Sequence, residues 1–156
     1  MEHSSSTMQL TRAADYAVRV MVHLATLPDH ERALLPALAR ATGAPESFLS
    51  KVLQALCRAG FIASRRGQLG GFEILSPGRV ASLRAVIEAI DGPIRLNVCM
   101  ISGASCNRKP TCPAHSVWVR AQEAMLQVLE KASIAEMAAE AVAAQAQVST
   151  SGSDPA

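Results

Sequence analysis

The chain has 156 residues, of which 49% are hydrophobic, 18% charged and only 3% aromatic, and its formal net charge is +2. This length supports one globular domain, or one small domain plus an appendage, and the apolar fraction excludes a wholly disordered chain. No run reaches the roughly 18 uncharged apolar residues of a membrane span, because Arg19 and His23 interrupt the best candidate. Residues 1–7 lack the apolar stretch of a secretory signal, so we expect the four cysteines to lie in a reducing cytoplasm rather than in disulfides.

Three helices are predicted in the N-terminal part of the chain. Apolar side chains recur at three- and four-residue spacing over residues 13–26, and Thr11 is the expected N-cap. A short second helix over 34–42 ends at Gly43, because glycine adopts the left-handed conformation at low steric cost. A third helix is predicted over 45–59, with its apolar residues on one face.

The second and third helices have the spacing of a helix-turn-helix. Small Ala39 lets the two helices approach, Gly43 makes the turn, and Leu49 packs the third helix against the second. Residues 61–75 form two short strand-like runs around a glycine-rich tip, which predicts a β-hairpin, and 76–78 is expected to end it. This order of elements predicts a winged helix-turn-helix.

Polar side chains suited to DNA lie on the outer face of the third helix and in the hairpin. Those on the helix can hydrogen-bond to base edges and phosphates in the major groove, and those in the hairpin can reach neighbouring phosphates or the minor groove. Within residues 40–79 six basic side chains stand against two acidic ones. Double-stranded DNA is therefore the expected partner, and a winged helix that binds another protein is the alternative. The predicted DNA-binding residues are Ser47, Ser50, Lys51, Gln54, Arg65, Arg66 and Gln68.

The C-terminal half is predicted to contain three further helices. One spans 82–90, and a longer one spans about 113–132 and has a wide apolar face. Residues 133–136 have the form of a capping box and begin a last, alanine-rich helix. The predicted fold is mainly α-helical with a small β-hairpin wing. Its organisation is an N-terminal extension (1–7), a DNA-binding domain (8–80), a linker helix with the cysteine loop and dimerisation helices (81–144), and a disordered tail (145–156).

Three cysteines and a histidine form the pattern C-x6-C-x5-C-x2-H just before the long helix, at Cys99, Cys106, Cys112 and His115. Three thiolates in one loop can converge on a soft metal centre. The spacing lacks the paired C-x2-C knuckles of most structural zinc sites, whereas iron–sulfur clusters accept such open spacing. An iron–sulfur cluster, a zinc ion and reactive thiols all remain open from the residues alone.

Other features of the sequence receive less specific interpretations. Cys57 is expected to pack as a small core residue, and His115 is either a metal ligand or a polar surface residue. No phosphate-binding glycine loop, Ser-His-Asp grouping or paired carboxylates stand out, so we do not expect an enzyme.

The winged helix followed by the cysteine loop resembles one bacterial family, the Rrf-two group of transcriptional repressors of IscR, NsrR and RirA type. The resemblance covers residues 8–138. It rests on Leu10-Thr11, Asp15-Tyr16-Ala17, Arg19, Phe48-Leu49, Lys51-Val52-Leu53, Leu56, Arg58-Ala59-Gly60, the stretch Arg66-Gly67-Gln68-Leu69-Gly70-Gly71-Phe72, Leu75, the three cysteines and Ile134-Ala135-Glu136-Met137.

The resemblance implies a homodimer in which the two long helices pair antiparallel, and an iron–sulfur cluster held by the three cysteines. The fourth ligand in the IscR-like branch corresponds to His115 and implies a [2Fe–2S] cluster. In the NsrR-like branch it corresponds to Asp15 of the partner subunit and implies a [4Fe–4S] cluster. We favour His115, because a ligand next to the cysteine loop needs no partner subunit to place it. The expected function is a transcriptional regulator that senses redox state, nitric oxide or iron and binds a near-palindromic operator.

Overall fold

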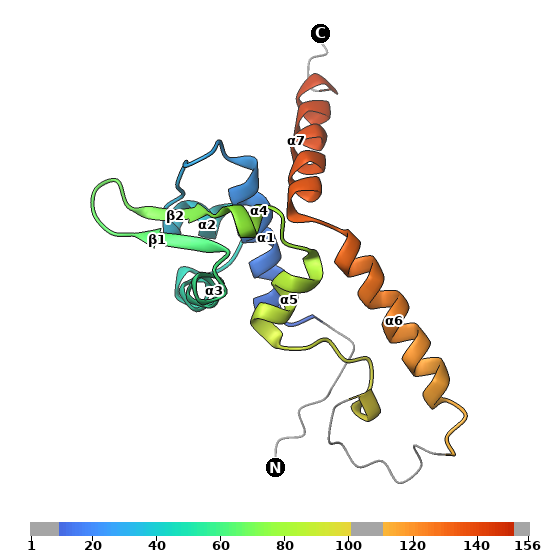
Figure 1. Cartoon of the computed structure of the whole chain (residues 1–156). Helices are drawn as coiled ribbons and strands as arrows, with labels where there is room; N and C mark the ends of the chain where they lie inside the picture. Colours follow the sequence, from blue (N-terminus) through green and yellow to red (C-terminus); the bar gives the residue numbers. More distant parts are fainter. Residues whose placement is uncertain (1–9, 101–110, 152–156) are drawn as a thin grey trace.

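The computed structural model describes residues 10–100 and 111–151 (Figure 1). This part of the chain is mainly helical and has one antiparallel hairpin, which confirms the predicted fold class. Among the described residues, no helix combines the length and the apolar character needed to cross a membrane. The elements in chain order are α1 (Arg12–Thr26), α2 (Leu35–Thr42), α3 (Glu46–Arg58), β1 (Ile62–Arg65), β2 (Gly71–Ile74), α4 (Ser76–Arg79), α5 (Leu83–Asp91), the 3₁₀ turn η1 (Val98–Met100), α6 (His115–Lys131) and α7 (Ile134–Ser151).

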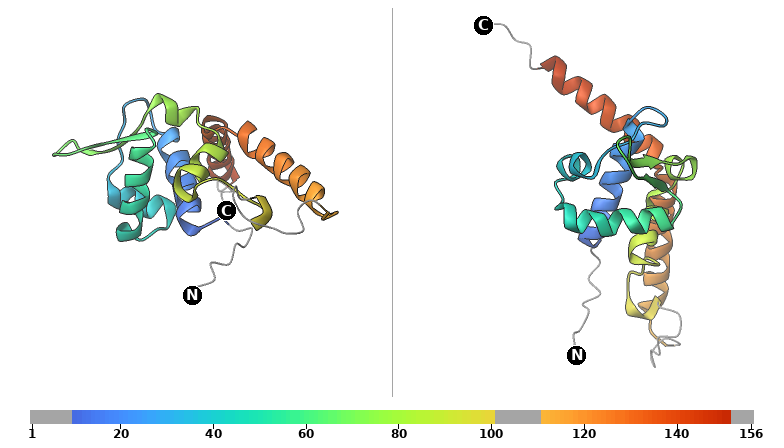
Figure 2. Two further views of the ribbon diagram at one scale, coloured as in Figure 1. Left: turned by 60° about the horizontal axis from the view of Figure 1, so that its bottom comes forward. Right: turned by 90° about the vertical axis from the view of Figure 1, so that its left-hand side faces the viewer.

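Helix α1 is the centre of the molecule and contacts α2, α3, α5 and α7 (Figures 1 and 2). Its N-terminus is capped as predicted, because Thr11 Oγ1 accepts a hydrogen bond of 3.1 Å from the Ala14 amide. Its buried residues recur at three- and four-residue spacing, so one face lies wholly in the core. They are Ala14, Ala17, Val20, Met21 and Leu24.

The helix-turn-helix forms where it was predicted. Helix α2 ends at Gly43, whose φ of 71° is the left-handed conformation that glycine adopts without a side-chain clash. The Ala44 amide then donates to the Ala39 carbonyl oxygen, 3.2 Å away, and closes the turn. Leu49 is fully buried and fixes α3 against the rest of the domain.

The predicted hairpin is a wing that projects from the body of the domain (Figures 1 and 2). Strand β1 pairs antiparallel with β2, and Ala33, in the loop between α1 and α2, makes a further antiparallel bridge to Phe72. Residues 76–78 were expected only to end the hairpin, but they belong to a short helix, α4. A proline in its first turn favours this start, because proline has φ fixed near the helical value.

The C-terminal helices also begin near their predicted positions. Ser82 caps α5, and the capping box before α7 forms because Ser133 Oγ accepts from the Glu136 amide while the Glu136 carboxylate accepts from the Ser133 amide. The backbone and side chain of Ser133 hold the pKa of the Glu136 carboxyl below its ordinary value. Residues 145–151 were predicted to be part of a disordered tail but continue α7, because alanine and glutamine are good helix formers. The N-terminal extension (1–7) lies outside the described residues.

Candidate functional site

The outer face of α3 presents the polar residues that the sequence singled out. Ser47, Lys51 and Gln54 are exposed, and their spacing places them on one side of the helix. Ser50 lies on the same face but is partly buried, and its hydroxyl donates to the Glu46 carbonyl oxygen at 3.0 Å. Three of the four predicted side chains on this helix are therefore free to reach a partner.

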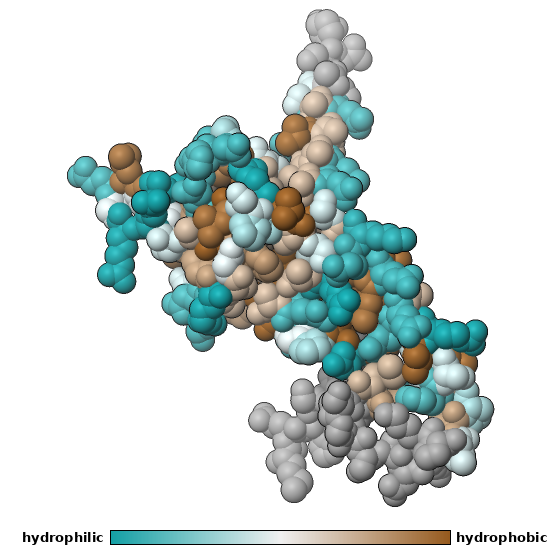
Figure 3. Space-filling model, viewed as in Figure 1, coloured by the Kyte–Doolittle hydropathy of each residue, from teal (hydrophilic) through white to brown (hydrophobic). Residues whose placement is uncertain are grey.

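The wing carries the other predicted DNA-binding residues. Arg65, at the end of β1, and Arg66 and Gln68, in the tip, are all exposed. Leu69 is 85% exposed at the same tip. Figure 3 shows this projecting wing as a mainly hydrophilic surface with one hydrophobic group. The wing and α3 together offer a polar, net basic surface of the kind that binds the phosphate backbone.

Side chains of α1 contact α2 and α3, the two helices of the helix-turn-helix. The sequence patterns did not reveal these contacts. Arg19 Nη1 donates to the Thr42 carbonyl oxygen at 3.2 Å, at the end of α2, and Arg19 Nη2 pairs with Asp15 at 2.9 Å. The Tyr16 ring meets the Phe48 ring of α3 edge to face, with 5.7 Å between centroids. A shift of α1 would therefore move both helices of the helix-turn-helix.

Cys99 and Cys112 flank residues 101–110, which include Cys106 and lie outside the described part of the chain. Cys99 is in η1 and Cys112 precedes α6. The segment that ends in η1 and the start of α6 lie at the same end of the molecule (Figures 1 and 2). Both cysteines are free and partly buried. Within residues 10–100 and 111–151, no three cysteine, histidine, aspartate or glutamate side chains converge as a metal site.

His115 is the first residue of α6, and its ring has an unsatisfied nitrogen. Its Nδ1 atom is buried and has no hydrogen-bond partner in the described part of the chain. The His115 amide donates to the Cys112 carbonyl oxygen at 3.2 Å, so the two residues are held one turn apart. A buried polar atom without a partner is costly unless another group binds it. The donor set of thiols and imidazole fits a soft metal centre or an iron–sulfur cluster.

The two other candidate residues differ from His115 in their surroundings. Asp15 is half exposed and already paired with Arg19, so it could bind a metal only by leaving or sharing this ion pair. Cys57 lies on α3, where burial raises the pKa of its thiol despite the opposing charge of Arg58. Cys57 is therefore a neutral packing residue, as its sequence position indicated.

A strap of residues 92–97 joins α5 to the cysteine segment (residues 99–112) and is held by hydrogen bonds to the neighbouring helices. Just before the strap, the Thr11 hydroxyl donates to the carboxylate of Asp91, the last residue of α5, at 2.6 Å. The Ile94 amide donates to Glu88 Oε1 at 3.2 Å, and the Leu96 amide donates to Gln122 Oε1 at 3.0 Å. These bonds connect the approach to Cys99 with α1, α5 and α6.

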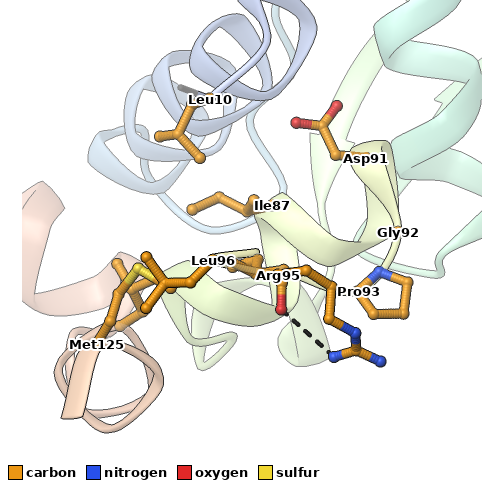
Figure 4. A pocket seen from close by; sticks show the side chains of 10 residues that line it. Leu10, Ile87, Asp91, Gly92, Pro93, Arg95, Leu96 and Met125 are labelled. Atoms are coloured by element: carbon orange, nitrogen blue, oxygen red, sulfur yellow. Dashed lines mark hydrogen bonds between the residues drawn. The ribbon is translucent and has the colours of Figure 1, made fainter. Parts of the chain in front are cut away.

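Beneath this strap lies a mainly apolar cavity of about 360 Å³ (Figure 4). Figure 4 shows Leu10, Ile87, Leu96 and Met125 turned toward it, while the Arg95 guanidinium points away. Its described lining includes neither a cysteine nor a histidine. The described lining of the cavity therefore supplies no thiolate or imidazole to a metal centre.

Helix α6 presents an apolar stripe that no described residue covers. The stripe consists of Val117, Ala121, Ala124 and Val128, all exposed and all on one side of the helix. The adjacent stripe, which includes Met125 and Leu129, lines the cavity instead. Figures 1 and 3 show α6 leaving the body of the domain with hydrophobic groups among its hydrophilic ones.

Comparison with known proteins agrees with this architecture. Residues 10–140 match the Rrf2 (Rrf-two) family of iron-dependent transcriptional regulators. Rv1287 of Mycobacterium tuberculosis, named as an HTH-type transcriptional regulator, is 34% identical over 131 residues, covering 84% of this chain and 81% of the relative.

Two solved structures share the fold. CymR (YrzC), the global cysteine regulator of B. subtilis, superposes with a TM-score of 0.68 at 21% identity, covering 85% of this chain and 97% of that one. IscR of T. potens also has a TM-score of 0.68, at 23% identity, and covers 88% of this chain and 90% of its own. The chain therefore belongs to the Rrf2 family, and it is a winged-helix, DNA-binding transcriptional regulator rather than an enzyme.

Proposed function

We propose that this regulator is a homodimer that holds an iron–sulfur cluster on Cys99, Cys106 and Cys112 and senses redox state, nitric oxide or iron through it. The observation that carries this function is the buried, unpartnered Nδ1 of His115, one turn from Cys112. Thiolate-held clusters supply a centre that oxidants and nitric oxide attack and that depends on iron supply. The cytoplasm is the expected location, since it keeps such thiols reduced.

His115 is the fourth ligand that we favour, with a [2Fe–2S] cluster. The Nδ1 atom of His115 is buried without a partner in the described part of the chain, and His115 lies one turn from Cys112, whereas the Asp15 carboxylate is paired with Arg19. In the alternative arrangement, Asp15 of the partner subunit completes a [4Fe–4S] cluster. That ligand would compete with Arg19 for the carboxylate and would loosen the contact of α1 with the end of α2.

The contacts within the subunit offer a route from the cysteine segment to the reading helix. The strap before Cys99 is held to α5 by the hydrogen bond from Ile94 to Glu88, and the last residue of α5, Asp91, accepts a hydrogen bond from Thr11, the N-cap of α1. Helix α1 in turn holds α2 through Arg19 and α3 through Tyr16. A change of state at the cysteines would thus reach the DNA-binding face through hydrogen-bonded and packed elements.

Dimer formation through α6 would place two α3 helices on one face of the DNA. The uncovered apolar stripe of α6 supports this pairing, because such a face is normally buried against a partner. A twofold-symmetric dimer reads a near-palindromic operator whose half-sites lie about one helical turn apart.

Replacement of Lys51 by alanine tests the DNA-binding face. Lys51 is exposed on the outer side of α3, so it is expected to neutralise one phosphate. The variant should bind duplexes of any sequence more weakly, and the slope of log affinity against log salt should flatten by about one unit. Fluorescence anisotropy with a labelled duplex over a series of salt concentrations measures both effects.

Lys131→Ala is the matched control, because it removes the same charge from the exposed last turn of α6. Its salt slope should equal that of the unmodified protein. An unchanged slope for Lys51→Ala would show that α3 does not face the phosphates.

A thiol sensor without a cluster is the second candidate. The specific observation in its favour is that Cys99 and Cys112 are both free and partly buried on either side of the same segment. A Staphylococcus aureus CymR structure with the same fold is described as an oxidized form. In this mode the cysteines would oxidise to a disulfide or a sulfenic acid. A third alternative is a regulator stabilised by zinc, which measuring the metal content of the purified protein would reveal.

A further inference from the structure

The wing contains one acidic residue among its basic ones, and this residue is almost wholly buried. Glu73, in β2, is 9% exposed and pairs with Ala63 of β1. A buried carboxylate is expensive unless hydrogen bonds and positive charge compensate it. Its partners therefore indicate what it does.

Glu73 joins the wing to the loop between α1 and α2. His30 Nδ1 donates to Glu73 Oε1 at 2.9 Å, and Arg32 Nε donates to Glu73 Oε2 at 3.3 Å. The Arg32 guanidinium reaches further and donates from Nη1 to the Leu69 carbonyl oxygen at 2.7 Å. The hydrogen bond from His30, with Arg32 as a further contributor and burial opposing, holds the pKa of the Glu73 carboxyl below its ordinary value. The carboxylate is thus ionised at neutral pH.

The backbone around these side chains is arranged to allow the contact. Ala33 and Phe72 exchange two backbone hydrogen bonds of 2.9 and 3.0 Å, which places the loop beside β2. A side chain at Gly71 would come within 2.9 Å of the Ala33 carbonyl oxygen, so only glycine permits this approach. His30, with φ of 65°, is the one non-glycine residue of the described ranges in the left-handed region. Such a conformation persists where the surroundings hold it.

We propose that Arg32 and Glu73 are positioning residues that hold the wing tip against the α1–α2 loop, so that Arg65 and Arg66 meet the DNA already in place. Two four-residue strands alone make a marginally stable hairpin. Arg32 fixes its tip at Leu69, and Glu73 fixes Arg32. The inference rests on the assignment of the wing to the DNA-binding face and is independent of the cysteine site.

Glu73→Gln tests the inference by the sign of its effect. Removing a negative charge from a DNA-binding surface should strengthen binding if only long-range electrostatics operate. Loss of the positioning contacts should instead weaken binding about tenfold, within the range of couplings found in one hydrogen-bonded network. The probe is a fluorescein-labelled duplex that the unmodified full-length protein selects from a random-sequence pool, with all proteins compared in one metal state.

Glu31→Gln is the matched control, because Glu31 is an exposed acid in the same loop. Its affinity should be unchanged or slightly higher. Arg32→Gln is a second test that leaves Glu73 in place, in case the buried substitution impairs folding. Circular dichroism of each variant checks that the helices remain.

A double-mutant cycle separates positioning from direct contact. In a background of Arg65→Ala and Arg66→Ala, Glu73→Gln and Arg32→Gln should each have less than about a twofold further effect, because the groups that they position are gone. Two results would overturn the positioning role while leaving the DNA-binding face intact. One is that the substitutions weaken binding as much in the Arg65→Ala, Arg66→Ala protein as in the unmodified protein; the other is that Glu73→Gln alone binds DNA more tightly. If the unmodified protein selected no duplex from the pool, the DNA-binding face itself would be overturned, and the inference with it.

Discussion

Protein produced and purified without oxygen is expected to be brown, with visible absorbance and with iron and sulfide in similar amounts. The Cys112→Ala variant should be colourless, because the cluster needs all three thiolates that the segment before α6 supplies. His115→Ala should alter the spectrum if His115 is the fourth ligand, and Asp15→Ala should alter it if the partner's Asp15 is.

Cys57→Ala is the control for this experiment. Cys57 lies on α3 with a raised thiol pKa, away from the cysteine segment, so its loss should leave colour and iron content unchanged. A colourless native protein with one zinc per chain would contradict the cluster and favour the structural zinc site. A colourless, metal-free protein whose thiols are lost on peroxide treatment would favour the thiol sensor.

A charge in the apolar stripe of α6 is expected to separate the dimer. Ala124 is exposed in the middle of this stripe and is a small residue on a helix, so Ala124→Glu should leave the subunit folded. Twofold symmetry places the new carboxylate twice in one interface. Each uncompensated buried charge costs about 3–5 kcal/mol, so the dissociation constant of the dimer should rise at least about 100-fold. Analytical ultracentrifugation measures the change, and the monomer should bind a palindromic duplex far more weakly.

Gln127→Glu adds the same charge on the neighbouring polar face of α6, and it should leave the dimer nearly unaffected, since rim charges contribute little. If Ala124→Glu sediments as a dimer of unchanged stability, the two subunits do not pair through this stripe.

Local patterns carried most of the fold prediction. The predicted caps at Thr11 and Ser133 and the glycine at position 43 mark real helix ends, because each acts on atoms within a few residues. The short helix α4 was missed because its sequence, Ser-Pro-Gly-Arg, is typical of a turn as much as of a helical first turn. Helix α7 extends past its predicted end, because the low-complexity segment after 144 was taken for disorder although it begins with the helix-favouring residues Gln145, Ala146 and Gln147.

The candidate sites were predictable in part, since the exposed faces follow from helical spacing but long-range contacts do not. Lys51 and Gln54 are exposed where the 3.6-residue period puts them. The contact of Arg32 with Leu69 joins residues 37 positions apart, and its acceptor is a backbone carbonyl group that every residue carries. The one signal for this contact in the sequence was a single glutamate in a basic hairpin. The burial of His115 Nδ1 without a partner among the described residues likewise depends on how side chains pack around α6. The spacing of Cys112 and His115 in the sequence does not show this packing.

We propose that the state of the cysteine-held centre governs how tightly the dimer binds DNA. The direct measurement is the affinity of one dimeric preparation for one selected duplex, before and after the metal is removed with a chelator under anaerobic conditions. The two affinities should differ by about 5- to 150-fold, the range of ordinary allosteric coupling. Equal affinities for the loaded and the stripped dimer would contradict it.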